Sequence, residues 1–385
     1  MQEMGWSRRA FGAAALGTVA STLAPQAWAQ DGERIVLGQS CAMSGPNAQL
    51  GLQYHQGAKL FFDRLNAQGG IHGRKVELRV LDDGYEPERC KANTQRLISE
   101  GAFALFGYVG TPTSVAALPL VERARIPFFA PLTGADALRQ RQLDGLVFNV
   151  RASYADETAL IVRQLTQLGL NKVAVFYQND DYGRSGLAGV RAALAERGLA
   201  PVAEATVERN SVDVQAAVDQ LVAQAPHAIV QITTYSASAA FVRAARKAVY
   251  GGQFMNVSFV GTQALTQELG NEADGVVVSQ VMPSPFKGSV FMTRKYTEAL
   301  RSVGQESAAN YSGLEGFFAA TVFAEGLRQA LPAGKSSLTR DALVGALRAM
   351  DGERVEGFPL DFHASQPRRR FVELSMLTSS GKVVV

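Results

Sequence analysis

The 385-residue sequence is poor in the side chains that metal sites and disulfide-rich folds require, since it has only two Cys and four His. It contains no CxxC and no HExxH pattern, which argues against a zinc enzyme. Cys41 and Cys90 each follow a predicted strand, and the pattern allows either a disulfide or two free thiols, because sequence does not fix their separation. We therefore expect no metal and no cofactor.

Long runs of like charge and long apolar segments are missing as well. The longest like-charge run is Arg368–Arg370 and the formal net charge is +3, so composition gives no support for a nucleic-acid partner. No segment offers about 18 uninterrupted apolar residues, which predicts a soluble mature chain. The apolar share of 47% and the charged share of 19% are typical of a globular protein with a large core.

The N-terminus has the pattern of an export signal. Arg8 and Arg9 precede a weakly apolar stretch, and Ala27-Trp28-Ala29 ends it with the small-x-small pattern that a signal peptidase accepts. The arginine pair resembles the twin-arginine export signal, which is a receptor-read address. We interpret residues 1–29 as a twin-arginine-type signal peptide and expect the mature chain in the periplasm.

Strand and helix patterns alternate along the rest of the chain. RIVLGQSCA and NKVAVFYQND contain continuous apolar runs of the kind found in buried strands, KVELRVLDD alternates as a strand does, and a helical pattern follows each of them. About nine such units are too many for one modest open sheet, so the predicted fold class is α/β with two doubly wound, Rossmann-like lobes. An eight-unit barrel is the competing fold, but long helices and an antiparallel-looking pair of strands near the end favour two lobes.

Small, hydroxyl and aromatic residues gather where the predicted strands end. SCAMSGPN follows the first strand, Thr111 and Thr113 follow the third, and Thr133 follows the fourth. Segments 180–183 and 233–235 follow strands of the second half. Because ligands bind beyond the carboxyl ends of strands in open parallel sheets, these clusters predict a binding cleft between the lobes.

Several of these segments carry a resemblance to a known family. SCAMSGPNAQLG, RLNAQGGIHGRKVELRVLDDGYEP, FALFGYVGTPTSVAALP, VAVFYQNDDYGRSGLAGVRAALAERG and VSFVGTQ resemble the periplasmic leucine/isoleucine/valine-binding protein family. The similarity extends over about residues 31–385. It implies a type I periplasmic binding protein, the solute-binding receptor of an ABC importer, whose partners are a small carboxylate or amino-acid-like ligand and a membrane permease. It also implies a mature chain that is monomeric and not an enzyme.

The resemblance further implies three hinge crossings between the lobes. We expect them near Asn149–Arg151, Val281–Pro283 and Gly357–Leu360. Lobe one would then comprise residues 31–149 and 283–356, and lobe two residues 150–282 and 357–385. Several hinge strands allow closure with few changed dihedrals.

The resemblance also implies ligand-binding positions. The family holds a ligand carboxylate with a hydroxyl and backbone N–H groups after the third and fourth strands, and closes aromatic side chains of the second lobe over it. The matching positions, together with those of the side-chain pocket and one further wall, are Leu50, Tyr108, Thr111, Leu132, Thr133, Gly134, Tyr182, Tyr235, Gln263 and Tyr311.

Gln263 stands where the family has an acidic residue that grips a ligand ammonium group. An amide supplies no charge, and burying a cation without a paired anion is costly. The departure therefore favours a non-amino carboxylate over an α-amino acid. Asp181 could replace the missing acid if it points into the cleft; alternatively, Asp180 and Asp181 cap the helix that follows them.

Two other functions remain as alternatives. An enzyme would need a nucleophile elbow, a phosphate-binding loop or a Ser/His/Asp set, and the sequence shows none of these motifs. A ligand-sensing subunit of the same fold would report to a signalling partner rather than to a permease, and the export signal does not separate these two roles.

Overall fold

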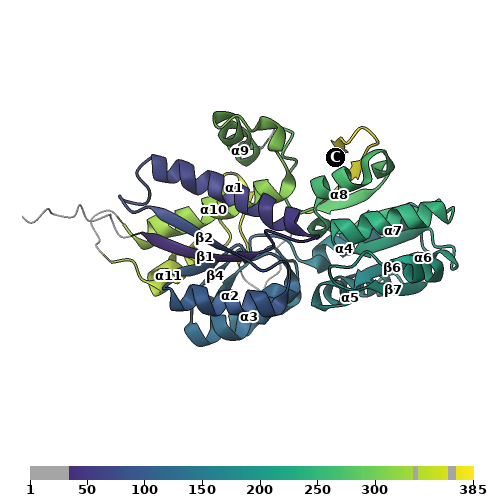
Figure 1. The fold of residues 1–385 in the computed structure, drawn as a ribbon, viewed down its shortest axis with the longest axis horizontal. Coiled ribbons are helices and arrows are strands. Elements are labelled where there is room, and N and C mark those ends of the chain that lie inside the picture. Colours follow the sequence, from purple (N-terminus) through teal and green to yellow (C-terminus); the bar gives the residue numbers. More distant parts are fainter. Residues whose placement is uncertain (1–33, 289, 333–336, 363–369) are drawn as a thin grey trace, which may run out of the picture.

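The computed structural model describes residues 34–288, 290–332, 337–362 and 370–385, so the predicted signal peptide at 1–29 lies outside the described residues. The described chain forms two lobes that lie side by side, each built on its own sheet (Figure 1). The lobe drawn at the left holds the N-terminal strands, and the lobe at the right holds the middle of the chain. We call them the first and the second lobe.

The first lobe contains a five-stranded parallel sheet in the order β2-β1-β3-β4-β5. Its strands are β1 (Ile35–Cys41), β2 (Val76–Asp82), β3 (Ala104–Phe106), β4 (Phe128–Phe129) and β5 (Val147–Phe148). Its helices are α1 (Ala48–Ala67), α2 (Pro87–Ser99), α3 (Thr111–Ala124), α9 (Phe291–Ser302), α10 (Tyr311–Ala330) and α11 (Arg340–Ala349). A hairpin of β11 (Arg354–Val355) and β12 (Phe358–Pro359) follows α11.

The second lobe contains a seven-stranded sheet in the order β14-β13-β10-β9-β8-β6-β7. Its strands are β6 (Val173–Gln178), β7 (Ala203–Val207), β8 (Ala228–Ile232), β9 (Gln253–Asn256), β10 (Val277–Gln280), β13 (Glu373–Leu377) and β14 (Val383–Val384). Its helices are α4 (Tyr154–Gln167), α5 (Asp181–Ala195), α6 (Gln215–Val222), α7 (Tyr235–Lys247) and α8 (Thr262–Leu269). Short 3-10 turns lie at 136–138, 141–143, 258–260, 270–273 and 306–308.

The predicted pair of doubly wound lobes is confirmed. Strands β1–β10 pair in parallel within two separate open sheets, which excludes the eight-unit barrel. The pair β13–β14 is antiparallel, as the sequence indicated, and β13 adds to β10 of the second lobe. Strand β8 is buried along its whole length, because helices of a doubly wound lobe cover both faces of its sheet.

The chain passes from one lobe to the other at three places. It leaves the first sheet after β5 and enters the second lobe at α4, and it returns between β10 and α9. The ring of Phe362 lies 5.4 Å from that of Phe148, and the ring of Phe358 lies 5.0 Å from that of Phe318. Both therefore pack on the first lobe. The ring of Phe371 lies 5.7 Å from that of Phe358, so we propose that the third crossing lies between Phe371 and β13, later than the Gly357–Leu360 predicted from the sequence.

Local sequence explains how the helices near the cleft begin. Ser153 forms a capping box with Asp156 at the start of α4, so the chain turns into a helix directly after the first crossing. In the first lobe, α1 and α10 approach each other so closely that a Cβ on Gly57 would overlap the carbonyl oxygen of Gly313. Only glycine therefore fits at position 57. This close approach positions the first turn of α10 against the middle of α1.

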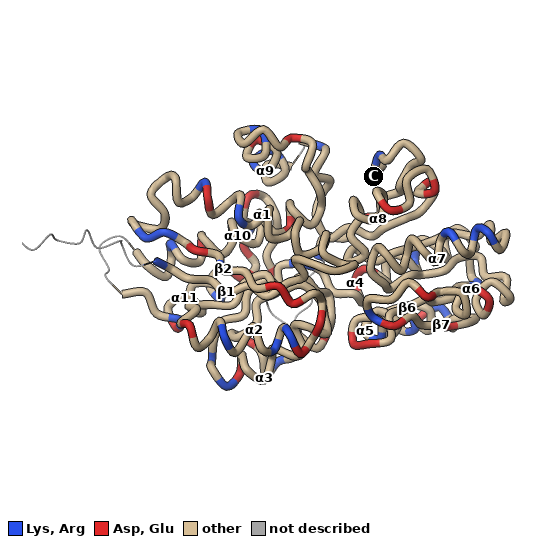
Figure 2. Tube along the Cα trace, in the orientation of Figure 1, with Lys and Arg blue, Asp and Glu red and all other residues tan. Residues whose placement is uncertain are grey.

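The remaining features of the described residues can be stated briefly. Cys41 and Cys90 are both buried and free. Among the residues that the structure describes, no helix is both long and apolar enough to cross a membrane. Figure 2 shows Lys and Arg interspersed with Asp and Glu over both lobes, with neither sign confined to one of them.

Candidate functional site

A small cavity lies where the two lobes meet. Its volume is about 10 Å³, the space of about one water molecule. First-lobe residues of α1 and α10 and second-lobe residues around 258 and 280 close over it. Its lining consists of Leu50, Leu132, Arg151, Ser258, Phe259, Gln280, Val281, Met282, Tyr311, Ser312 and Glu315. A ligand of several heavy atoms therefore enters this cavity only when the lobes move apart.

Buried charges surround the cavity, and we call Arg151, Glu157, Ser258 and Glu315 the ionic cluster. Arg151, in the first crossing, has its Nε 3.4 Å from Oε1 of Glu315, with side chains only 1% and 5% exposed. Nη2 of Arg151 donates to the Ser258 hydroxyl. Glu157 accepts from the backbone N–H of Ser258 at 2.7 Å and from the Ser279 hydroxyl at 2.6 Å. Charges are rarely buried this fully, so the cluster marks a functional candidate.

The two carboxyl groups of the ionic cluster differ in how they are held. Burial raises the pKa of Glu315 to about 7; Arg151 opposes the shift and Glu157 adds to it. Burial also raises the pKa of Glu157, but Arg151 and the hydrogen bonds from Ser279 and Ser258 oppose this. For Arg151, burial disfavours the charge, yet Glu315 and Glu157 outweigh it and raise the pKa. Hydrogen bonds thus favour the charged form of Glu157, whereas at Glu315 only the charge of Arg151 opposes the effect of burial.

Hydroxyl and aromatic groups adjoin the cavity. The hydroxyls of Thr111 and Thr133 lie 2.6 Å apart at the ends of the first-lobe strands, and that of Thr111 lies 3.5 Å from the Tyr154 hydroxyl of the second lobe. The Tyr182 ring lies 5.3 Å from that of Tyr154 and 4.8 Å from that of Phe259, which lines the cavity. The hydroxyls of Thr111, Thr133 and Tyr154 thus form a polar group, and the Tyr154 ring connects it to the rings of Tyr182 and Phe259.

Comparisons with known proteins agree with this arrangement. A family model described as periplasmic binding protein matches residues 34–376. The chain belongs to the periplasmic binding protein family. A structure of a possible leucine/isoleucine/valine-binding protein from Rhodopirellula baltica SH 1 is 30% identical, with a TM-score of 0.85 over 92% of this chain and 97% of that one. A substrate-binding periplasmic protein from Ralstonia solanacearum is 32% identical, with a TM-score of 0.84 over 91% and 99%.

Curated relatives have the same character. Leu/Ile/Val-binding protein homolog 7 of Brucella suis biovar 1 (strain 1330) is 26% identical over 372 residues, which cover 91% of this chain and 90% of the relative. The protein is thus a ligand-binding receptor of the leucine/isoleucine/valine-binding type. Membership of the periplasmic binding protein family places it outside the cytoplasm.

The structure brings together most of the positions carried over from this family. Leu50, Leu132 and Tyr311 line the cavity. Gly134 abuts the start of α4, where its carbonyl oxygen accepts from the N–H of Tyr154 at 2.8 Å and a Cβ would clash with the Tyr154 ring. Whether these residues contact a ligand stays a prediction.

Gln263 joins the two lobes. Its Oε1 accepts a hydrogen bond of 3.1 Å from the backbone N–H of Tyr311 at the start of α10. Its Nε2 is buried and has no hydrogen-bond partner among the described residues. The amide that replaces the family's acid thus already serves as a contact between α8 and α10.

Tyr108 lies elsewhere. Its ring packs against that of Phe128 at 4.9 Å, and its hydroxyl lies 3.0 Å from that of Thr94, inside the first lobe. It is fully buried and does not line the inter-lobe cavity. The prediction that Tyr108 forms a wall of the cleft is therefore not supported, because its side chain points into the core beneath α2.

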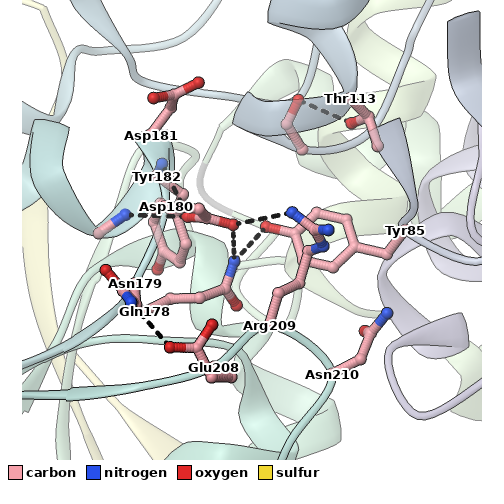
Figure 3. A network of polar contacts seen from close by, with 12 residues as sticks. Tyr85, Thr113, Gln178, Asn179, Asp180, Asp181, Tyr182, Glu208, Arg209 and Asn210 are labelled. Atoms are coloured by element: carbon pink, nitrogen blue, oxygen red, sulfur yellow. Dashed lines mark hydrogen bonds and ion pairs between the residues drawn. The ribbon is translucent and has the colours of Figure 1, made fainter. Parts of the chain in front are cut away.

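A second set of contacts, the cross-lobe polar network, ties the lips of the cleft together. Glu86 of the first lobe accepts from Arg209 at 3.0 Å and from Asn210 at 2.7 Å, both from the loop after β7. Nε2 of Gln178 donates to the Tyr85 hydroxyl across the lobes at 3.2 Å (Figure 3). The loop 40–47 takes part, because the Ser236 hydroxyl donates to the carbonyl oxygen of Pro46 at 2.8 Å.

Three further side chains lie in or near the cross-lobe polar network. Tyr235 accepts from the backbone N–H of Gln49 at 3.4 Å, so it reaches the first lobe. Asp180 caps α5 by accepting from the backbone of Tyr182, and its carboxyl group lies 3.5 Å from Arg209 (Figure 3). Asp181 is exposed and pairs with Arg184. Asp181 therefore does not replace the family's acid at Gln263.

A larger surface cavity, of about 460 Å³, lies on the first lobe between α3, the 142–146 segment and α11. Two of its arginines are already engaged. Arg340 donates to the carbonyl oxygens of Phe103 and Ala102, and Arg348 to that of Asp144. We therefore take the inter-lobe cavity, with its buried and incompletely paired groups, as the functional site.

Sequence reasoning missed the ionic cluster. The sequence indicates Arg151 only as part of an expected crossing between the lobes, and it assigns no role to Glu315. A signal was present, because Glu315 is the only charged residue in the first fourteen residues of α10, YSGLEGFFAATVFA. A lone acid in an otherwise apolar helix needs a buried partner, but the sequence did not say which.

Proposed function

We propose that the protein is the solute-binding receptor of an ABC importer and captures a small carboxylate or amino-acid-like ligand between its lobes. The observation that carries this proposal is the inter-lobe cavity, where the Arg151–Glu315 pair meets an apolar wall of Leu50, Leu132 and Phe259. Small-molecule sites of this kind combine apolar walls with a few placed polar groups. The names of the relatives, which include leucine/isoleucine/valine-binding proteins, agree with such a ligand.

The binding test is a thermal-shift screen of the mature chain against amino acids, organic acids and their neutral amides. A ligand present at about 100 times its Kd adds about 2.7 kcal/mol to the free energy of unfolding, which is readily measured. We expect one solute class to stabilise the protein and to return unchanged by mass spectrometry. Consumption of the solute would point to an enzyme, and a screen without any stabilising solute would contradict the receptor.

The importer role is tested in cells of the source organism. Deletion of the gene should abolish uptake of the radiolabelled solute found in the screen, and a plasmid copy should restore it. A deletion that leaves uptake intact but abolishes a transcriptional response to the solute would indicate the sensor subunit instead. Replacing Arg8 and Arg9 with Lys should keep the protein in the cytoplasm if export follows the twin-arginine pathway.

A further inference from the structure

We infer that Arg151 is a ligand-binding residue, and that a carboxylate of the ligand replaces the charge of Glu315 beside it while Glu315 takes up a proton. This inference rests on the proposed receptor function and deepens it. It names a monocarboxylate with an apolar body as the ligand class and adds a linkage between binding and protons.

The guanidinium group of Arg151 has unused hydrogen-bond donors among the described residues. A guanidinium group has five N–H donors in a rigid fork that matches a carboxylate. Nη2 donates to the Ser258 hydroxyl, whereas Nε and Nη1 are buried and donate to no atom among the described residues. Nε faces Oε1 of Glu315 at 3.4 Å without forming a hydrogen bond. Such a buried donor edge is costly unless an acceptor reaches it.

The charges around Arg151, those of Glu157 and Glu315, allow a ligand carboxylate to take the place of one of them. Glu157 accepts hydrogen bonds from the Ser258 N–H, the Ser258 hydroxyl and the Ser279 hydroxyl, and each of these bonds favours its charged form. Among the described residues Glu315 has only the 3.4 Å pairing with Arg151, and its Oε1 is buried there without a hydrogen bond. If a ligand carboxylate arrives while Glu315 becomes neutral, the cluster keeps the same net charge.

The other titratable groups near Arg151 do not disturb this balance. Tyr54 of α1, Tyr154 of α4 and Tyr182 of α5 also interact electrostatically with it. Burial raises the pKa of all three hydroxyls, that of Tyr154 to about 12, so all three are neutral at physiological pH. Since burial also raises the pKa of Glu315 to about 7, this carboxyl can accept a proton under the same conditions.

The rest of the cavity lining is largely apolar. Leu50, Leu132, Phe259, Val281 and Met282 supply apolar surface around the ionic cluster. Gln263 supplies no charge for a ligand ammonium group. The chemistry that these residues recognise is therefore an anionic head on a hydrocarbon or aromatic body.

The experiment compares two acids, 4-methylpentanoate and phenylacetate, with their neutral amides by titration calorimetry on the wild-type mature chain. We expect at least one acid to bind and its amide to bind at least tenfold more weakly. Between pH 6 and pH 8 the Kd of the acid should rise about tenfold, because Glu315 must be protonated in the complex. At pH 8, titrations in buffers of different ionisation enthalpy should reveal uptake of about one proton per ligand.

Two variants and one control locate the effect. Glu315→Gln keeps the side-chain shape without a charge, so it should retain binding and lose both the pH dependence and the proton uptake. Arg151→Lys should weaken the acid at least tenfold at both pH values, because an ammonium group lacks the fork. Asp83→Asn is the control, since Asp83 is a buried carboxyl of the first lobe whose pKa burial raises to about 6 and which does not line the cavity. It should leave the pH profile of binding unchanged.

Several results would overturn the inference. These are the failure of both acids to bind, equal binding of acid and amide, a pH profile that persists in Glu315→Gln, or one that disappears in Asp83→Asn. If the screen of the preceding section finds an amino acid or a neutral solute instead, the inference fails while the receptor function stands. Circular dichroism of each variant at both pH values verifies that the comparison is made between folded proteins.

Discussion

The cross-lobe polar network offers a sharp test of lobe closure through the substitution Glu86→Ala. Glu86 of the first lobe accepts hydrogen bonds from Arg209 and Asn210 of the second lobe at 3.0 and 2.7 Å. These bonds exist only while the lobes meet. Their loss should therefore destabilise the closed form alone, and a ligand that needs closure should bind more weakly by the same free energy.

The size of this effect follows from the exposure of the partners. The side chains of Glu86 and Arg209 are 43% and 25% exposed, so the pair is screened by solvent and contributes modestly. Exposed pairs contribute about 0.2–1 kcal/mol, and the second bond from Asn210 brings the expected total to about 1 kcal/mol. This corresponds to about a fivefold rise in Kd. The rise should shrink at high salt because the interaction is ionic.

A matched control lies at the other end of the same helix. Glu100 follows α2 and accepts from Arg79 at 3.0 Å and from Arg96 at 2.7 Å, all within the first lobe. Glu100→Ala likewise removes a carboxylate with two hydrogen-bond partners, without touching the second lobe, so its Kd should equal that of the wild type. Calorimetry with the solute from the screen measures both variants. Equal Kd values for Glu86→Ala and the wild type, or equal losses in both variants, would refute the reasoning.

Three further predictions concern single side chains. Tyr182→Ala should raise the Kd by roughly 5- to 150-fold, on the order of 1–3 kcal/mol, since it removes the aromatic wall against Phe259; an unchanged Kd in calorimetry would exclude Tyr182 from the site. Gly57→Ala should lower the free energy of unfolding by about 1–3 kcal/mol because its Cβ would overlap Gly313, whereas Gly345→Ala, with open space around it, should be neutral or stabilising in the same denaturant titration. The folded state keeps the proton of Glu315 up to a pKa of about 7, so stability should fall by about 3 kcal/mol between pH 4.5 and 8 on account of this group, and Glu315→Gln should lack that fall; parallel pH profiles would contradict it.

The sequence alone determined the features that depend on neighbouring residues. The alternation of apolar runs with helical patterns gave two doubly wound lobes, because periodicity reports which faces of each element are buried. The start of α2 at Pro87 is likewise local information, since a proline at the first helical position suits the start of a helix. Asp180 was correctly considered as the cap of α5, because capping joins residues two or three positions apart.

The tertiary structure alone decided which distant groups meet between the lobes. Arg151 and Glu315 pair only because the first crossing runs past the start of α10, and nothing near either residue specifies the other. The same applies to Glu86 with Arg209, and to Phe362 with Phe148, whose packing supports our proposal of a later third crossing. Contacts of this kind depend on how two separate sheets are oriented, and burial patterns within one element carry no information about that orientation.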